Sequence, residues 1–70
     1  EVLEIIVLPE FNNKKIMDLK FPARAIIGVI QRKNNVIIPK GDTEIKSDDI
    51  LIIFTTADSA AKIKEFFKVK

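Results

Sequence analysis

The chain has 70 residues, and its 12 basic and 10 acidic residues are interspersed along it for a formal net charge of +2. This balance argues against an electrostatic nucleic-acid binder, and the absence of cysteine and histidine excludes disulfides, zinc sites built from those ligands and thiol or imidazole catalysis. No apolar run reaches the roughly 18 residues that span a bilayer, and the chain begins at Glu1 rather than methionine, so we expect one domain, residues 1–70, taken from a longer protein.

The first part of the chain predicts a strand followed by a short helix. Residues 2–8 are dense in β-branched side chains, which favour strands. Asn12 or Asn13 is placed to cap a helix that runs through Leu19, with Phe11 as its N-terminal hydrophobic staple. We therefore expect a short helix with Ile16 and Leu19 facing the core.

Residues 25–32 predict a second strand, and residues 36–38 a third. Lys33-Asn34-Asn35 between them is typical of a hairpin turn, because asparagine tolerates positive φ. Strict alternation places Ile26, Gly28 and Ile30 on one face of the second strand.

Two arginines, Arg24 and Arg32, flank the second strand at its opposite ends. Such cations are either solvated strand ends or are placed to face a phosphate, which a guanidinium can bind through two parallel hydrogen bonds. The sequence leaves both interpretations open.

The polar connector after the third strand must make two sharp reversals. Gly41 is expected to supply a φ that other residues resist, and Asp42 and Asp49 are expected to accept hydrogen bonds from backbone amides. The alternative is that the acidic cluster of Asp42, Glu44, Asp48 and Asp49 binds a hard cation, but the spacing of these residues does not follow the calcium-loop pattern. No nucleophile or orienting group accompanies them, so we predict no catalytic residues and no metal site.

Residues 50–55 predict the fourth strand, and a helix with Thr56 as its cap closes the chain. Ala60, Ile63 and Phe67 share one face of that helix. The order β-α-β-β-β-α predicts a small two-layer α+β domain with a mainly antiparallel sheet and helices packed on it.

The predicted strands are apolar on both faces, whereas a sheet with one wet face alternates polar and apolar residues. Two helices, one of them very short, cannot cover both faces, so we expect self-association to bury the remaining apolar surface. The alternative is that the helices and the connector wrap the sheet. All five aromatic residues are phenylalanine, and we expect Phe54, Phe66 and Phe67 in the core, which leaves no aromatic to stack on a nucleic acid.

Several runs resemble the TrkA C-terminal domain family, the C-terminal half of the regulator-of-potassium-conductance module. Residues 37–51 resemble its pattern I-x-P-x-G-D-T-x-L-x-x-G-D-x-L, and residues 26–32 resemble its V-x-I-V-A-I-x-R strand. Residues 12–19 resemble the polar run that precedes the first helix. Asn13 and Asp48 stand where the family has glycine, and both residue types tolerate positive φ.

The resemblance implies a regulatory, non-catalytic, cytoplasmic domain that follows a Rossmann-like domain and pairs with a copy of itself. It implies control of a membrane potassium channel or transporter subunit of a Trk/Ktr-type uptake system through rearrangement of the dimer; the alternative is a ligand-free oligomerisation module. Some members bind a cyclic dinucleotide at the paired interface, and others sense divalent cations. At the matching positions, the ligand or interface candidates are Ile26, Ile27, Arg32, Ile38 and Pro39.

Overall fold

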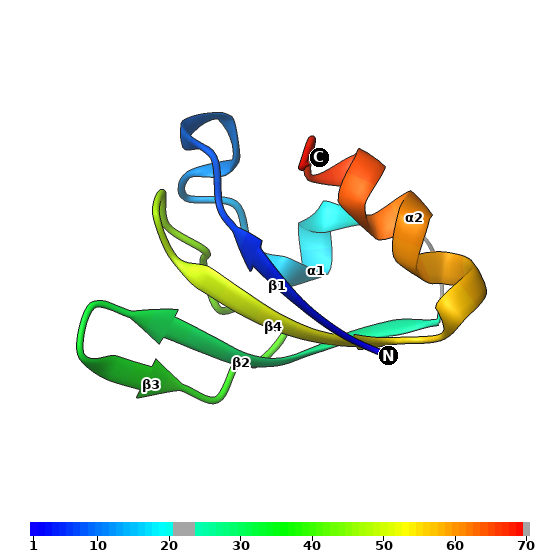
Figure 1. Ribbon diagram of the computed structural model, residues 1–70. Coiled ribbons are helices and arrows are strands. Elements are labelled where there is room, and N and C mark those ends of the chain that lie inside the picture. Colours follow the sequence, from blue (N-terminus) through cyan, green and yellow to red (C-terminus); the bar gives the residue numbers. More distant parts are fainter. Residues whose placement is uncertain (21–23, 70) are drawn as a thin grey trace.

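The computed structural model describes residues 1–20 and 24–69, which form a four-stranded sheet with helices on one face (Figure 1). The predicted α+β class and the order of elements are confirmed, with one additional short 3₁₀ helix, η1, after the first strand. The elements are β1 (Val2–Ile6), η1 (Pro9–Phe11), α1 (Ile16–Leu19), β2 (Ala25–Arg32), β3 (Asn35–Ile37), β4 (Ile50–Thr55) and α2 (Ala57–Phe66).

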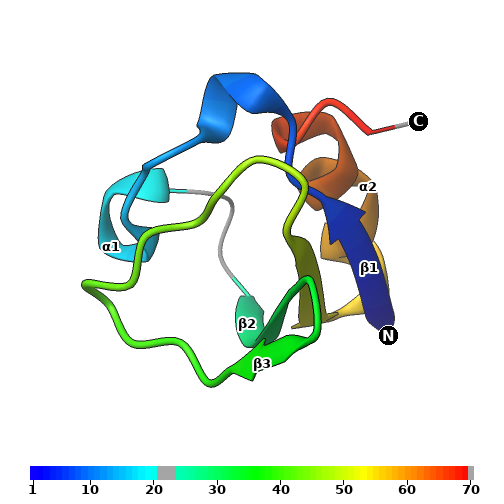
Figure 2. The same cartoon turned by 90° about the vertical axis from the view of Figure 1, so that its left-hand side faces the viewer.

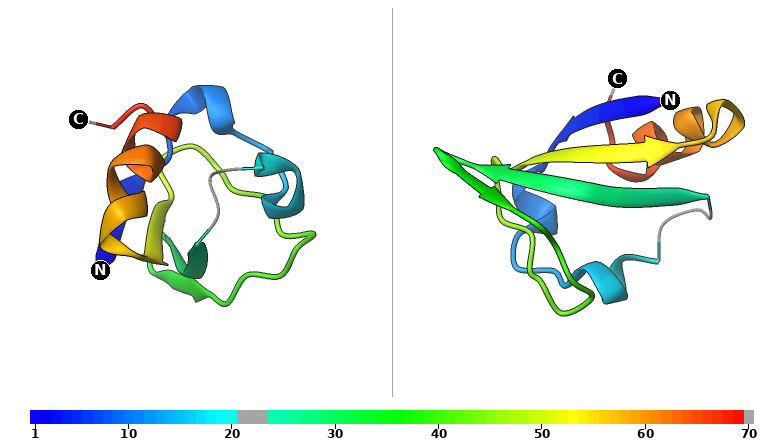
Figure 3. Two further views of the ribbon diagram at one scale, coloured as in Figure 1. Left: turned by 90° about the vertical axis from the view of Figure 1, so that its right-hand side faces the viewer. Right: turned by 90° about the horizontal axis from the view of Figure 1, so that it is seen from below.

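The sheet has the strand order β1-β4-β2-β3, and each pair of neighbours is antiparallel. The last strand in sequence, β4, lies between β1 and β2, with Leu51 opposite Ile5 on one side and Ile30 on the other. In the right panel of Figure 3, β4 and β2 run side by side through the centre of the sheet. The sheet therefore forms only when β1, the first strand in the sequence, pairs with β4, the last.

One face of the sheet carries the whole hydrophobic core. In Figure 1, η1, α1 and α2 lie above the sheet, and no helix of the described chain lies below it. Three phenylalanines join η1 to α2, because the ring centroid of Phe67 lies 5.4 Å from that of Phe11 and 5.0 Å from that of Phe66. The buried apolar residues are Leu3, Ile5, Val7, Leu19, Ile27, Ile30, Ile45, Leu51, Ile53, Ala60, Ile63 and Phe67.

The segment between β1 and α1 differs from its prediction. α1 begins only at Ile16 and has no side-chain cap, so neither asparagine caps it. Instead, Asn12 Oδ1 accepts a hydrogen bond from Ser47 N at 2.8 Å, and Asn13, at φ 68°, donates its backbone N–H to Ile45 O at 2.8 Å. The Phe11 ring packs against the rings of Phe66 and Phe67 at the end of α2. The asparagines therefore fasten this segment to the connector, which runs beside α1 in Figure 2.

Two smaller boundaries also differ from the prediction. The hairpin turn consists of Lys33 and Asn34, because Arg32 already pairs with Asn35, and the positive φ of 55° falls on Lys33 rather than on an asparagine. Thr56 does occupy the N-cap position of α2, but its hydroxyl makes no capping hydrogen bond. A hydrogen bond from that hydroxyl instead lowers the pKa of Asp58 in the first turn.

A β-bulge at Gly28 changes which residues of β2 face the core. Ile27 pairs with Ile53 and Val29 with Ile52, so the register shifts by one residue between them. As a result, Ile30 shares the buried face of Ile27 and is 0% exposed. Strict alternation along β2 was therefore the wrong prediction beyond Gly28, because it did not allow for the extra residue of the bulge.

We expect Gly28→Ala to cost at most about 1 kcal/mol of the free energy of unfolding. A Cβ at Gly28 would lie 2.4 Å from Phe54 Cε2, so the ring must move, but it is half exposed and can rotate away. The lower entropy of the unfolded alanine chain offsets part of this cost. Urea denaturation measures the cost of Gly28→Ala in the wild-type chain and in a chain that also carries Phe54→Leu, and the difference between the two costs is the coupling between these residues. A cost that persists without the ring would contradict this explanation.

Candidate functional site: the open face of the sheet

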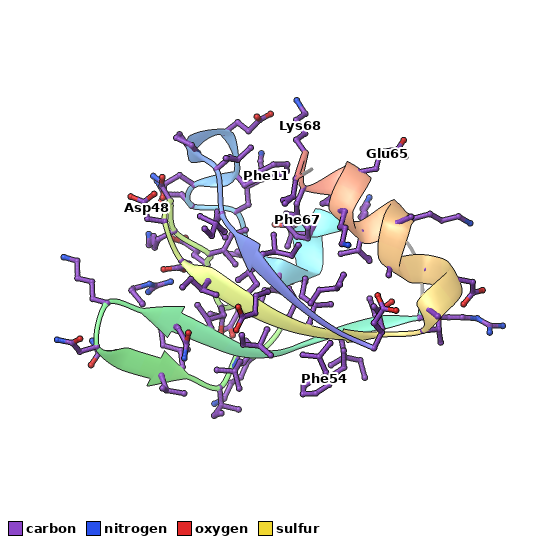
Figure 4. The ribbon with its side chains drawn as sticks, viewed as in Figure 1. Phe11, Asp48, Phe54, Glu65, Phe67 and Lys68 are labelled. Carbon is purple, nitrogen blue, oxygen red and sulfur yellow. The ribbon has the colours of Figure 1, made fainter. Side chains whose placement is uncertain are left out.

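The face of the sheet opposite the core is apolar and uncovered, and we call it the open face. Figure 4 shows Phe54 on this side of the sheet and Phe67 on the other. The register places Val2 opposite Phe54 and Phe54 opposite Ile26, so these side chains form one row across three strands. Six large apolar residues of this face are each at least 50% exposed: Val2, Ile6, Ile26, Val36, Ile38 and Phe54.

Half-buried branched residues fill the middle of the open face, since Val29 pairs with Ile52 between the exposed rows. Glu4 and Gln31 contribute polar groups to the same face. Monomeric proteins rarely leave so continuous an apolar surface in water, and such a surface marks a contact site. The sequence-based expectation of excess apolar surface is confirmed, and the alternative that helices and connector wrap the sheet is wrong for the described chain.

The structure distributes the five candidate residues over different environments. Ile26 and Ile38 lie on the open face, and Pro39 follows them half-buried at its margin. Ile27 is only 7% exposed and packs in the core, so its side chain is not available at the surface. Arg32 lies on the same face of β2 as the buried Ile30, because it follows Ile30 by two residues.

The guanidinium of Arg32 forms a bidentate ion pair with Asp49, which joins β2 to the start of β4. Arg32 Nε donates to Asp49 Oδ1 at 2.9 Å, and Nη2 donates to Asp49 Oδ2 at 2.8 Å and to Glu44 O at 3.0 Å. Three of the five N–H donors of Arg32 are therefore used within the subunit. In the isolated chain, Arg32 is therefore neither a solvated cation at the end of a strand nor an unpaired cation available to bind a phosphate.

The Asp49 carboxylate is 2% exposed and also accepts a hydrogen bond from Lys46 N at 2.8 Å. Burial alone would raise the pKa of Asp49, but the hydrogen bonds from Arg32 and Lys46 outweigh it and the pKa is lowered. The hydrogen bond to Asp49 likewise raises the pKa of Arg32. The predicted role of Asp49 as an acceptor in the turn is confirmed.

The other turn residues behave differently from the prediction. The Thr43 hydroxyl, rather than Asp42, closes the first turn by accepting a hydrogen bond from Lys40 N at 2.9 Å, and Asp42 accepts none from the described part of the chain. Gly41 does not have a positive φ, and a Cβ there would meet only Met17 at 3.8 Å. The strained turn residue is Asp48, at φ 73°, and its predicted tolerance of this conformation is confirmed.

Two negative results hold for residues 1–20 and 24–69. No group of three or more acidic side chains in these ranges is arranged to hold a metal ion. No helix in them is long and apolar enough to cross a bilayer.

A shallow hollow lies at the end of the open face where β2 begins and β4 ends. Its lining residues are Arg24, Ala25, Ile26, Phe54, Thr55 and Thr56. Phe54 was predicted to be in the core, but it is exposed here, because the apolar character of both faces of β4 concealed which face is inside.

Solved structures identify the class of this fold. A structure described as an RCK domain with cda superposes on the chain with a TM-score of 0.84 at 27% sequence identity, covering 94% of this chain and 96% of that one. The RCK_C domain dimer of S. agalactiae BusR in complex with c-di-AMP superposes with a TM-score of 0.81 at 26% identity, covering 99% and 97%. The architecture is therefore that of RCK domains.

Within that class, the chain belongs to the TrkA-C domain family, whose model matches residues 2–68. The Trk system potassium uptake protein TrkA homolog of Archaeoglobus fulgidus is 41% identical over 68 residues, which is 96% of this chain. Homolog 1 of Methanosarcina mazei is 34% identical over 55 residues, or 79% of the chain. The chain spans 16% and 12% of the lengths of these two relatives. The resemblance drawn from the sequence is confirmed.

Proposed function

We propose that the chain is a ligand-sensing dimerisation domain of a Trk/Ktr-type potassium-uptake protein and that it performs no catalysis. The observation that carries this proposal is the open face, on which Ile26, Ile38 and Phe54 remain exposed in a subunit whose core is already complete. The match to the TrkA-C family and the dimeric state of the BusR neighbour support it. A second copy of the chain is the proposed cover for this face.

Control of transport would follow from a preference of the ligand for one arrangement of the dimer. A ligand that binds two arrangements equally tightly shifts nothing, so the ligand must contact both subunits or a hinge between them. The proposal places the domain in the cytoplasm, where it acts on a membrane potassium channel or transporter subunit. It assigns no membrane insertion to this chain.

The proposed ligand is a cyclic dinucleotide, bound across the dimer beside Ile26, Ile38 and Pro39. Two solved neighbours support this choice, since one is described with cda and the other in complex with c-di-AMP. A two-fold symmetric ligand suits a two-fold symmetric surface, because each half meets identical groups. In Arg32, only the donors on Nη1 are left for such a ligand while Asp49 stays paired.

The second candidate is a ligand-free oligomerisation module. The pairing of Arg32 with Asp49 favours it, because a strong cation that is already neutralised contributes less to binding a phosphate. Under this alternative, the open face packs against its copy and leaves no room for a ligand.

We expect calorimetric titration of cyclic di-AMP into the domain to give saturable heat at one ligand per dimer. The stoichiometry follows from a site on the two-fold axis. Linear pApA, which has the same bases without ring closure, is the matched control and should bind more weakly, because an unclosed ligand loses more conformational freedom. Absence of heat and of any thermal shift, with the dimer intact by sedimentation, would leave the ligand-free module.

A further inference from the structure

We propose that the outer edge of β1 binds an extended segment of another polypeptide as an additional strand of the sheet, and that Glu4 selects a segment with lysine or arginine between two apolar residues. This inference goes beyond the proposed function. The added strand would lie in the plane of the sheet, so it would leave the open face to the second copy. In the right panel of Figure 3, β1 is the outermost strand on its side of the described chain.

The backbone of β1 presents a row of unpaired polar groups at this edge. The backbones of Glu1 and Val7 form hydrogen bonds of 2.9 Å to the chain at the two ends of β4. Successive residues of a strand direct their N–H and C=O groups to opposite sides. Those of Val2, Glu4 and Ile6 therefore point away from β4, and no hydrogen bond within residues 1–20 and 24–69 reaches them.

The edge formed by β1 carries few of the features that block pairing with another strand. Short length, proline, bulges and charged side chains protect the edge strands of most sheets. β1 has five residues without proline, and it pairs with β4 without a bulge. At the opposite edge, β3 has only three residues. Glu4 is the only charged residue within β1, so the selectivity of this edge depends on its carboxylate.

Glu4 lies on the open face between two exposed apolar side chains. Val2 is 57% exposed and Ile6 is 58% exposed. The Glu4 carboxylate is itself exposed and makes no ion pair within the described part of the chain. Directly opposite residues of paired strands interact, and apolar pairs and opposite charges are favourable. A segment that pairs here must therefore place a cation opposite Glu4 and an apolar side chain two residues to either side.

A second copy of this chain does not meet that requirement. Antiparallel pairing of two β1 strands centred on Glu4 would place like charges directly opposite each other, which is destabilising. Elsewhere in the 70 residues, no lysine or arginine has a branched apolar or aromatic residue two positions away on both sides. The chemistry of the edge therefore fits a different polypeptide. We assign it an antiparallel orientation, because antiparallel pairing is the more stable and all pairs of this sheet adopt it.

The first test is hydrogen exchange with a synthetic peptide that has a lysine at its centre, a valine two positions to each side and threonine elsewhere. The amides of Val2, Glu4 and Ile6 should exchange rapidly in the free chain. With free peptide at about ten times its Kd, their exchange should slow roughly 10-fold, because only the unbound fraction exchanges. The amide of Val36, at the opposite edge of the sheet, is the control and should not change.

An exchange of charges tests the role of Glu4. A peptide with glutamate in place of the central lysine should bind the wild-type chain about 3- to 10-fold more weakly, because attraction becomes repulsion. Glu4→Lys should reverse this preference, and it should leave the fold intact because Glu4 is exposed. Methylation of the two valine nitrogens, which face β1, should weaken binding at least about 10-fold. Methylation of two threonine nitrogens, which face away, is the matched control and should have no such effect.

The other outcomes overturn the proposal. Equal preferences of the wild type and Glu4→Lys for the two peptides would remove the selectivity assigned to Glu4. Slow exchange of the Val2, Glu4 and Ile6 amides in the free chain would show that a second copy covers the edge. Binding that does not respond to methylation of the valine nitrogens would place the peptide on the open face. Absence of binding at millimolar peptide would leave the edge without this partner. None of these results affects the dimer or the cyclic di-AMP binding expected under the proposed function.

Discussion

Replacing Ile26 or Ile38 with aspartate is expected to weaken the dimer at least about 30-fold. Both side chains are about 70% exposed on the open face, so the monomer tolerates a carboxylate there. In the dimer the carboxylate would lose its hydration without gaining a partner, which costs about 1 to 3 kcal/mol. A two-fold interface repeats each substitution, so the cost is doubled to about 2 to 6 kcal/mol. Sedimentation velocity over a concentration series measures the shift.

Two comparisons make this result specific. Met17 is 56% exposed on α1, away from the open face, so Met17→Asp introduces the same charge and should leave the dimer intact. Ile27→Asp should instead unfold the subunit, because Ile27 is buried in the core. Folded Ile26→Asp and Ile38→Asp chains that remain dimers at wild-type concentrations would exclude the open face as the interface.

Asp49→Ala is expected to lower the free energy of unfolding by about 3 kcal/mol. The substitution leaves the guanidinium of Arg32 and the N–H of Lys46 without their acceptor. Removing one partner of a fully buried pair costs about 3 to 5 kcal/mol, and we take the lower limit because the Arg32 side chain is 30% exposed. A domain of this size has roughly 4 to 10 kcal/mol in total, so a large part of the stability is lost.

The matched control is Asp42→Ala, in the same connector. Asp42 is exposed and accepts no hydrogen bond from the described residues, so its loss should change the stability by less than about 0.5 kcal/mol. Urea denaturation followed by circular dichroism measures both variants. Equal effects of the two substitutions would show that the Arg32–Asp49 pair contributes no more than a surface charge.

The same pair predicts how stability depends on pH. Because the pKa of Asp49 is lower in the folded chain than its ordinary value of 3.8, its contribution is present above pH 3.8 and is lost as the pH falls through the folded value. The pKa values of Glu44 and Asp58 are also lowered, because these carboxylates accept hydrogen bonds from Lys46 and Thr56, so the wild type loses stability in acid through several groups. The difference between wild type and Asp49→Asn should therefore shrink below pH 3.8. A constant difference from pH 7 to pH 2 would contradict this assignment.

Sequence patterns predicted the strands well where hydrophobicity alone decides them. Residues 50–55 form β4 as expected, with Leu51 and Ile53 buried and Phe54 turned outward. The same pattern could not say which face of the sheet is covered, because both faces of β4 are apolar. That choice depends on where α2 packs, which is a property of the tertiary structure. Phe54 was misassigned to the core for this reason.

Local irregularities account for the other differences. Beyond the bulge at Gly28, the residues of β2 face the opposite sides of the sheet from those that strict alternation predicts. A lone glycine in a strand indicates such a bulge but does not fix the register of the residues that follow it. The pairing of Arg32 with Asp49 joins residues 17 positions apart, and no periodicity in the sequence predicts it. Asn12 and Asn13 have the composition of a helix cap, but hydrogen bonds to the connector hold them elsewhere. For the two asparagines, a long-range contact therefore overrides the local preference.

An isotope-filtered nuclear Overhauser experiment on a mixture of labelled and unlabelled chains tests directly whether the open face joins two copies. Two subunits of 7.9 kDa form a dimer small enough for assigned methyl spectra. We expect intermolecular contacts that involve the methyl groups of Ile26, Val36 and Ile38 and the ring of Phe54. Intermolecular contacts confined to α2, or none at millimolar concentration, would contradict the assignment of the open face as the surface that joins two copies.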